Sequence, residues 1–159
     1  MIRDGLLDDN SLSEMWSLFY VSNSFLFPMY ARFEEDYNLT RPEFVTLFHL
    51  HHLNGLIAQD ISEISGLPKN SISRGVKRLI AKEMIVGMPD KRDRRRVVLS
   101  MTEHGKTMFE KLLATASERR VRILEPLSDG ERAFLGEVLL KLAHQARQRV
   151  DGPLDRNPA

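Results

Sequence analysis

The sequence predicts a mainly α-helical fold of the α+β class that contains a single small β-hairpin. Apolar residues recur three or four positions apart through most of the chain, which is the spacing of amphipathic helices. This spacing is interrupted between residues 84 and 100, where two short apolar runs flank a charged segment. The chain has 159 residues, of which 42% are hydrophobic and 28% charged, as expected for one globular domain or for one small core with an arm.

The first predicted helix begins at a capping box formed by Ser11 and Glu14 and runs to about Glu35. Its apolar residues at helical spacing are Leu12, Met15, Trp16, Phe19, Leu26, Tyr30 and Phe33. Phe27 widens this stripe beyond one face, so the helix must bury two sides, and a partner subunit is a natural second surface. Pro28 predicts a kink or a break in this helix.

Two shorter helices follow. The second predicted helix has Thr40 as its N-cap and Glu43 completing a capping box, and it ends near residues 54 and 55. The third covers residues 56–65 and is closed by Gly66, because glycine adopts the left-handed backbone that stops a helix.

The fourth predicted helix covers residues 69–82 and is strongly amphipathic. Its predicted buried stripe consists of Ile72, Val76, Leu79 and Ile80. The opposite face is polar and cationic, and it consists of Lys69, Asn70, Ser71, Ser73, Arg74, Lys77 and Arg78.

The hairpin and the last two helices complete the prediction. The strands are residues 84–89 and 95–100, and Thr102 caps a helix that reaches roughly Leu124. A capping box from Ser128 to Glu131 opens the last helix. We therefore expect a winged helix-turn-helix region at 39–102, flanked by helical dimerisation regions at 1–38 and 103–150 and followed by a flexible tail at 151–159.

Charge is concentrated in the middle of the chain. Residues 69–96 carry ten cationic and three acidic side chains, a net charge of +7, whereas the whole chain carries +1. Such a basic segment is typical of a polyanion-binding surface, although a solvated surface helix and loop explain the charge equally well.

The order of a helix, a glycine turn, a polar-faced helix and a basic hairpin favours DNA binding. In a helix-turn-helix the second helix enters the major groove with its polar residues facing base edges. We expect Arg74 to pair with guanine, and Lys69, Lys77 and Arg78 to bind phosphates. The wing would place one arginine in the minor groove and use its other cations for phosphates. The wing cations are Lys91, Arg92, Arg94, Arg95 and Arg96.

The stretch from Leu56 to Gly105 resembles the winged helix-turn-helix of the MarR family of bacterial regulators. The resemblance rests on Ser73-Arg74 with Val76 and Leu79, on Met84-Ile85, and on Asp93-Arg94-Arg95 followed by Val97, Leu99, Thr102 and Gly105. It implies that Asp93 orients the wing, that Arg95 enters the minor groove, and that the terminal helices form a homodimer. Met101, Gly75 and Pro68 depart from the usual pattern, and glycine inside a helix costs about 1 kcal/mol relative to alanine.

The resemblance also implies partners. It predicts a repressor that binds double-stranded DNA at a pseudo-palindromic operator and is relieved by a small-molecule effector such as an aromatic acid. Trp16, Phe19, Tyr20 and His52 are candidate lining residues for an effector pocket. Packing in a core or a dimer interface is the competing interpretation, because aromatic stripes at helical spacing usually serve packing.

Other functional classes find less support. Five histidines leave open a metal-responsive regulator. However, cysteine is absent and no His-x-x-x-His pair occurs; the position one helical turn after His104 is Met108 and not a second histidine. We therefore expect no metal site and no cofactor. Glycine-rich phosphate loops and Gly-x-Ser-x-Gly are absent, so we expect no catalytic residues and no enzyme. Without an apolar span or a signal peptide pattern, we expect a cytoplasmic protein with no membrane partner. A winged helix that binds protein or RNA is the remaining alternative.

Overall fold

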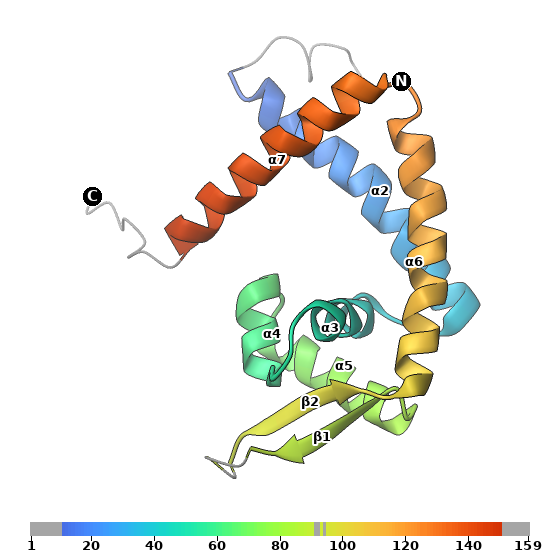
Figure 1. Ribbon diagram of the computed structural model, residues 1–159, viewed down its shortest axis with the longest axis vertical. Coiled ribbons are helices and arrows are strands. Elements are labelled where there is room, and N and C mark those ends of the chain that lie inside the picture. Colours follow the sequence, from blue (N-terminus) through green and yellow to red (C-terminus); the bar gives the residue numbers. More distant parts are fainter. Residues whose placement is uncertain (1–10, 91–92, 94, 151–159) are drawn as a thin grey trace. The chain divides into compact units, whose positions relative to one another are not determined.

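The computed structural model describes residues 11–90, 93 and 95–150, with side chains through residue 146 (Figure 1). The tail predicted to be flexible, residues 151–159, lies outside this range. Within the described residues the fold contains six helices and one two-stranded antiparallel sheet, so the predicted fold class is confirmed. The chain forms two compact units, residues 1–120 and 121–159. None of the described helices is long and apolar enough to cross a membrane.

Helix α2 (Ser13–Tyr37) starts one residue later than a cap at Ser11 would require. Its N-cap is Leu12, which forms no side-chain cap hydrogen bond, so the predicted Ser11 capping box is wrong. The helix is also continuous through Pro28, and the predicted break does not occur.

The break is avoided because α6 supplies a donor. Proline has no N–H for the carbonyl four residues earlier, which here belongs to Ser24. The Arg119 guanidinium donates a hydrogen bond to that Ser24 carbonyl and, over 2.8 Å, another to the Phe25 carbonyl. An arginine distant in the sequence therefore satisfies the carbonyl that Pro28 leaves free.

Helices α3 to α5 form the helix-turn-helix. Helix α3 (Arg41–His52) has Thr40 as its N-cap, as predicted, and it ends earlier than predicted because Leu53 is already extended. Helix α4 (Ala58–Ser65) is closed by Gly66 at φ +67°, as predicted. Helix α5 (Lys69–Ala81) follows after a short turn.

The wing is a β-hairpin of strands β1 (Ile85–Pro89) and β2 (Val97–Met101). The strands pair antiparallel, with Ile85 opposite Met101 and Pro89 opposite Val97, so β2 starts two residues later than predicted. The Leu99 N–H donates to the Leu56 carbonyl over 2.9 Å, which joins β2 to the loop before α4.

Helix α6 (Glu103–Leu124) leaves the wing at a tight junction. The Thr102 hydroxyl accepts a hydrogen bond from the Gly105 N–H at 3.0 Å, which confirms the predicted N-cap, and donates to the Glu83 carbonyl at 2.7 Å. A β-carbon on Gly105 would lie 2.0 Å from the Met84 carbonyl oxygen, so only glycine fits there.

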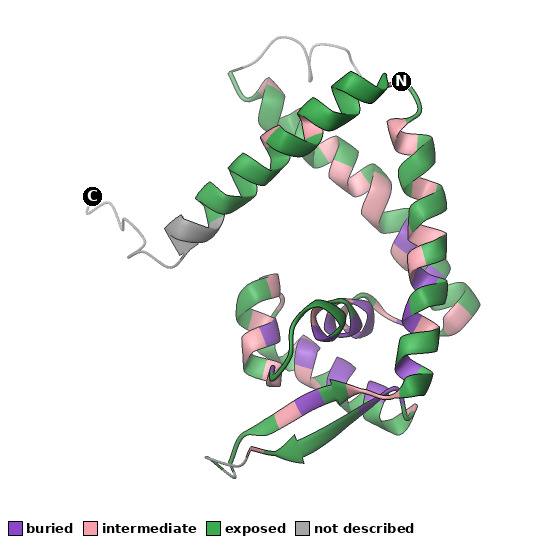
Figure 2. Ribbon diagram, in the orientation of Figure 1, coloured by how far each residue is buried: buried purple, intermediate pink, exposed green. Residues whose placement is uncertain are grey.

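The core of the first unit lies between α2, α3, α5, α6 and the wing (Figure 2). Phe33 and Phe44 pack with ring centroids 4.9 Å apart, and Phe44 stacks on Phe109 at 6.3 Å. The fully buried apolar side chains are Phe33, Leu39, Leu47, Ile61, Ile72, Leu79, Ile85, Phe109 and Leu112.

In the second unit, helix α7 (Asp129–Val150) begins at the predicted capping box. The Glu131 carboxylate accepts hydrogen bonds from the Ser128 N–H at 2.8 Å and from its hydroxyl at 2.7 Å. The described side chains of α7 include no buried residue, and Phe134 is 67% exposed. Leu140 and Leu142 of this helix are exposed as well, whereas Leu135 and Val138 are half-buried.

Candidate nucleic-acid interface

Helix α5 has one buried face and one open face. Ile72, Val76 and Leu79 are buried as predicted, whereas Ile80 is 44% exposed and its predicted burial is wrong. Each residue advances about 100° around a helix, so Ile80 is rotated away from the side on which Leu79 packs. Five members of the predicted polar face are exposed: Lys69, Asn70, Arg74, Lys77 and Arg78. Ser71 and Ser73 are half-buried at its edges.

Gly75 lets α5 approach α3 closely. It is buried, and a β-carbon there would lie 3.1 Å from the Pro42 β-carbon and 3.3 Å from the Glu43 nitrogen. The helix propensity lost at this glycine, about 1 kcal/mol, is therefore offset by close packing between the two helices. The departure noted in the sequence has a structural reason.

A buried carboxylate holds the end of α5. Glu43 is fully buried, and its carboxylate lies 2.8 Å from the Lys82 ammonium and 3.4 Å from the Arg78 Nε. Arg78 also donates to the Asn38 side-chain oxygen at 3.4 Å, and Lys82 donates to the Asn38 carbonyl. Arg78, which the sequence assigns to a phosphate, is thus paired with an acid of α3, although its side chain is exposed.

The charge of Glu43 is stabilised where it lies. Burial by itself raises the pKa of a carboxyl group, but hydrogen bonds from Lys82 and from the Thr40 hydroxyl and N–H outweigh burial and lower the Glu43 pKa. The Thr40 N–H lies 2.9 Å from the carboxylate. Sequence reasoning identified Glu43 only as a capping residue, because its cationic partners lie on another helix.

The wing turn is shaped by Asp93. Its carboxylate accepts a hydrogen bond from the Arg95 N–H at 3.0 Å, and its carbonyl accepts one from the Arg96 N–H at 2.9 Å. The Arg95 side chain is exposed beside this turn. Arg96, which is also exposed, lies 4.0 Å from the Asp60 carboxylate of α4. Lys91, Arg92 and Arg94, which the sequence also assigns to the wing, lie outside the described residues.

Two cavities lie beside these elements in the first unit. One, of about 320 Å³, is lined by apolar side chains of α2, α3 and α6. These are Phe25, Leu26, Met29, Tyr30, Phe44, Val45, Phe48, Leu113 and Ala116. The Arg41 guanidinium lies over the Tyr30 ring, 5.5 Å from its centroid. Burial raises the pKa of the Tyr30 hydroxyl and outweighs the opposing effect of Arg41.

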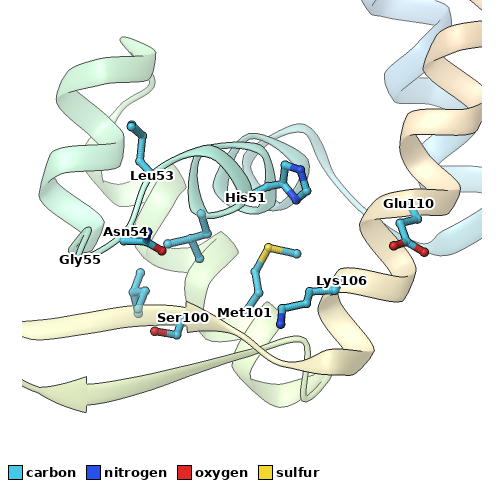
Figure 3. A pocket seen from close by; sticks show the side chains of 10 residues that line it. His51, Leu53, Asn54, Gly55, Ser100, Met101, Lys106 and Glu110 are labelled. Carbon is cyan, nitrogen blue, oxygen red and sulfur yellow. The ribbon is translucent and has the colours of Figure 1, made fainter.

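The second cavity, of about 490 Å³, lies where the end of α3, strand β2 and the start of α6 meet (Figure 3). We call it the α3-end cavity. Its apolar lining is Leu50, Leu53, Leu99 and Met101, and its polar lining is His51, Asn54, Ser100, Lys106 and Glu110, with Gly55 between.

The residues predicted for an effector pocket line neither cavity within one chain. Trp16, Phe19 and Tyr20 instead follow one another along α2, with ring centroids 5.6 and 6.3 Å apart. His52 lies at the end of α3, 4.7 Å from the Phe48 ring. The described residues contain no group of three or more His, Asp and Glu side chains placed to hold a metal ion.

Comparison with known proteins gives one consistent relationship. Residues 37–96 match the profile of the MarR family. SarZ of Staphylococcus aureus, an HTH-type transcriptional regulator, is 26% identical over 115 residues, covering 72% of this chain and 75% of SarZ. The HTH-type transcriptional repressor NicR of Pseudomonas putida is 28% identical over 107 residues, covering 67% of this chain and 68% of NicR.

Solved structures share the fold. A MarR transcriptional regulator from Methanosarcina mazei superposes with a TM-score of 0.76 at 18% identity, covering 85% of this chain and 96% of that protein. BpsR of Bordetella bronchiseptica, whose DNA binding is regulated by 6-hydroxynicotinic acid, superposes with a TM-score of 0.64 at 21% identity. That superposition covers 80% of this chain and 98% of BpsR.

Proposed function

Because this chain belongs to the MarR family of winged helix-turn-helix regulators, which bind DNA and control transcription, we propose that it is a homodimeric repressor released by a small aromatic acid. The proposal rests on the observation that α5 has one buried apolar face and one exposed cationic face. Its buried face fixes the helix in the lobe, while Lys69, Arg74 and Lys77 are exposed and form no ion pair with a described residue. These cations are free to meet DNA.

The proposed contacts follow from groove dimensions. An α-helix with its side chains is about 10–12 Å across and fits the major groove, which is about 12 Å wide. Arg74 would pair with the O6 and N7 of guanine, a contact that discriminates by about 1–3 kcal/mol. Lys69 and Lys77 would bind phosphates, and Arg95 would enter the adjacent minor groove, where the negative potential is enhanced.

Dimerisation is supported by apolar side chains that one chain leaves in water. On α2, Phe19 is 54% exposed and Phe27 is 61% exposed. On α7, Phe134 and Leu140 are 67% and 62% exposed. A second subunit that covers these faces removes apolar area from water, which is the main driving force for association. A two-fold dimer would read half-sites about 34 Å apart, one turn of DNA.

The 320 Å³ cavity is the proposed effector site. Its aromatic lining, including Tyr30, Phe44 and Phe48, suits the ring of a small acid, and Arg41 beside Tyr30 is a counter-ion for its carboxylate. A ligand in this cavity contacts Phe44 of α3. Glu43, which precedes Phe44 in the chain, binds Arg78 and Lys82 at the end of α5, so the ligand can change the position of that end. Such a ligand releases DNA only if it binds the DNA-free arrangement more tightly. Trp16, Phe19, Tyr20 and His52 do not line this cavity, and their role in an effector pocket stays a separate prediction.

The DNA-binding proposal is tested by selecting bound duplexes from a random pool. We expect an enriched pseudo-palindrome whose complex survives salt that removes random duplex. Arg74→Ala should relax base preference at one position of each half-site, whereas Lys77→Ala should weaken all duplexes and reduce the salt slope by about 1. Equal weakening of all sequences by both substitutions would make Arg74 a phosphate contact. Preference for single strands over every duplex would favour the RNA-binding alternative.

The effector proposal is tested on the complex of the protein with the selected operator. Benzoate, salicylate and 6-hydroxynicotinate are titrated while fluorescence anisotropy follows release of labelled DNA. We expect at least one acid to release the operator from the natural protein. Ala116→Phe, which fills the cavity, should abolish that release while DNA affinity stays within about twofold. Release that is equally efficient from the Ala116→Phe protein would place the acid elsewhere.

A further inference from the structure

We propose that the α3-end cavity is a second ligand site, one that binds a small amphiphilic amine: an ammonium group attached to an apolar body. The cavity has a volume of about 490 Å³ and is enclosed by three different elements, α3, β2 and α6 (Figure 3). This volume lies in the range of sites that bind small molecules, about 300–1,000 Å³.

The cavity is formed before any ligand arrives. The hydrogen bond from the Leu99 N–H to the Leu56 carbonyl, 2.9 Å long, joins the loop after α3 to β2. The Thr102 cap fixes the start of α6 beside them. Leu50 and Leu99 are buried, and together with Met101 they give the cavity an apolar floor. An apolar body of matching size gains free energy by leaving water for such a floor.

The charges at the rim favour a cation. Glu110 lines the cavity and makes no hydrogen bond or ion pair with any residue that the structure describes. The one cation of the lining, Lys106, already binds the Glu103 carboxylate at 2.6 Å. Lys106 and Glu110, the two charged residues of the lining, sum to zero, and Glu103, which lies outside the lining, brings the local charge to −1. The carbonyl end of α3, which carries the negative end of the helix dipole, also borders the cavity at Leu50 and His51.

The polar side chains of the rim can accept hydrogen bonds from an ammonium group. The His51 ring packs against buried Phe109, with centroids 4.6 Å apart, and this contact fixes its position. The ring nitrogens of His51, the Asn54 amide and the Ser100 hydroxyl make no hydrogen bond within the described part of the chain. An ammonium group needs only acceptors, and Glu110, Asn54 and Ser100 each provide an oxygen.

The two cavities therefore have opposite preferences. The 320 Å³ cavity has Arg41 beside it and suits an acid, whereas the α3-end cavity has an unpaired carboxylate and suits an amine. Binding to the α3-end cavity can be measured without DNA, so this inference stands or falls separately from the proposed effector.

The test uses three probes with one body and different head groups: 3-phenylpropylamine, 3-phenylpropanol and 3-phenylpropionate. Each is titrated into the full-length protein at low salt, and amide signals are followed by two-dimensional ¹H–¹⁵N NMR. The amine should shift the signals of Asn54, Gly55, Ser100 and Lys106 saturably, and it should bind at least about tenfold more tightly than the alcohol. The acid should leave these four signals in place. Equal or tighter binding of the acid, or amine shifts confined to Phe44 and Phe48, would overturn the proposal.

Substitutions at the rim locate the charge. Glu110→Gln should weaken the amine about tenfold and leave the alcohol unchanged, since only a charge-assisted hydrogen bond is lost. Lys106→Gln should leave the amine unchanged or tighten its binding, because a neighbouring cation is removed. Glu118→Gln, an exposed carboxylate on the same helix, is the matched control and should have no effect. Both Glu110 and Glu118 are exposed, so both proteins should fold. Unchanged amine affinity in Glu110→Gln would refute the site.

Discussion

Glu43 holds the end of α5, and replacing it with glutamine should lower the free energy of unfolding at pH 7 by about 3 kcal/mol. The substitution keeps the shape of the side chain but removes its charge. With the glutamine oxygen kept toward Thr40 and Arg78, it also turns an NH2 group, a donor, toward Lys82, which is a donor itself.

The magnitude follows from the contacts of the carboxylate. The bond to Lys82 is 2.8 Å long, is made by a fully buried acid and is charge-assisted, which corresponds to about 1.5–3 kcal/mol. The Arg78 contact is longer, 3.4 Å, and the Arg78 side chain is 47% exposed, so solvent screening limits it to about 0.5 kcal/mol. The bonds from Thr40 can persist, since the glutamine oxygen also accepts.

The effect should depend on pH in one direction. The pKa of Glu43 is lowered in the folded protein, so its stabilisation is complete above the unfolded pKa of about 4.3. The stabilisation is lost as the pH falls below that value and through the lower folded pKa. The difference between the natural protein and Glu43→Gln should therefore be largest near neutral pH and shrink in acid.

Urea unfolding followed by circular dichroism, at one protein concentration and at pH 7 and pH 3.5, measures both effects. Asp36→Asn is the control, because it breaks an ion pair with Arg32 that lies at the surface and should leave the midpoint unchanged. A loss below about 1 kcal/mol at pH 7, or a difference that grows in acid, would show that Glu43 is not the anchor of α5.

Four other substitutions test the scaffold and the wing. Gly105→Ala puts a β-carbon 2.0 Å from the Met84 carbonyl oxygen and should destabilise the protein by about 3 kcal/mol in urea. Gly136→Ala, with nothing within 4 Å, should instead add up to about 1 kcal/mol. Arg119→Met removes the donor for the Ser24 carbonyl and should cost about 1–3 kcal/mol, less in a Pro28→Ala background, as a double-mutant cycle would show. Arg95→Ala should weaken operator binding in anisotropy titrations while size-exclusion chromatography still shows a dimer; unchanged affinity would refute the minor-groove assignment.

Local signals predicted most helix boundaries, because caps act within one turn of the chain. The caps at Thr40, Thr102 and Ser128 are where the sequence places them, and α4 ends at Gly66. The buried side of α5 follows from periodicity for three of its four predicted members. Ile80 fails because a single helical stripe is narrower than the set of apolar residues assigned to it.

Features that depend on distant partners could not be predicted. Pro28 breaks a helix when its freed carbonyl has no donor, and the donor here is Arg119 on α6. In an isolated helix Gly75 would only lower stability. In the folded protein its lack of a side chain allows the close contact with Pro42. In both cases the sequence identified the unusual residue, and the fold supplied its reason.

The same limit applies to the cationic segment. Its charge density predicts the DNA interface, but density alone does not say how many cations are free for DNA. Lys82 and Arg78 bind Glu43, and Arg96 faces Asp60, so three of the ten cations counted in the sequence are engaged by acids far from them along the chain. Among the described residues of this segment, the cations without an ion pair are Lys69, Arg74, Lys77 and Arg95. The salt slope of DNA binding grows by about 0.9 for each phosphate neutralised, so it should follow this smaller set plus any wing cations outside the described range. Glu43 thus removes two cations from the set that can attract DNA, but it fixes the orientation of α5. Base recognition depends on that orientation.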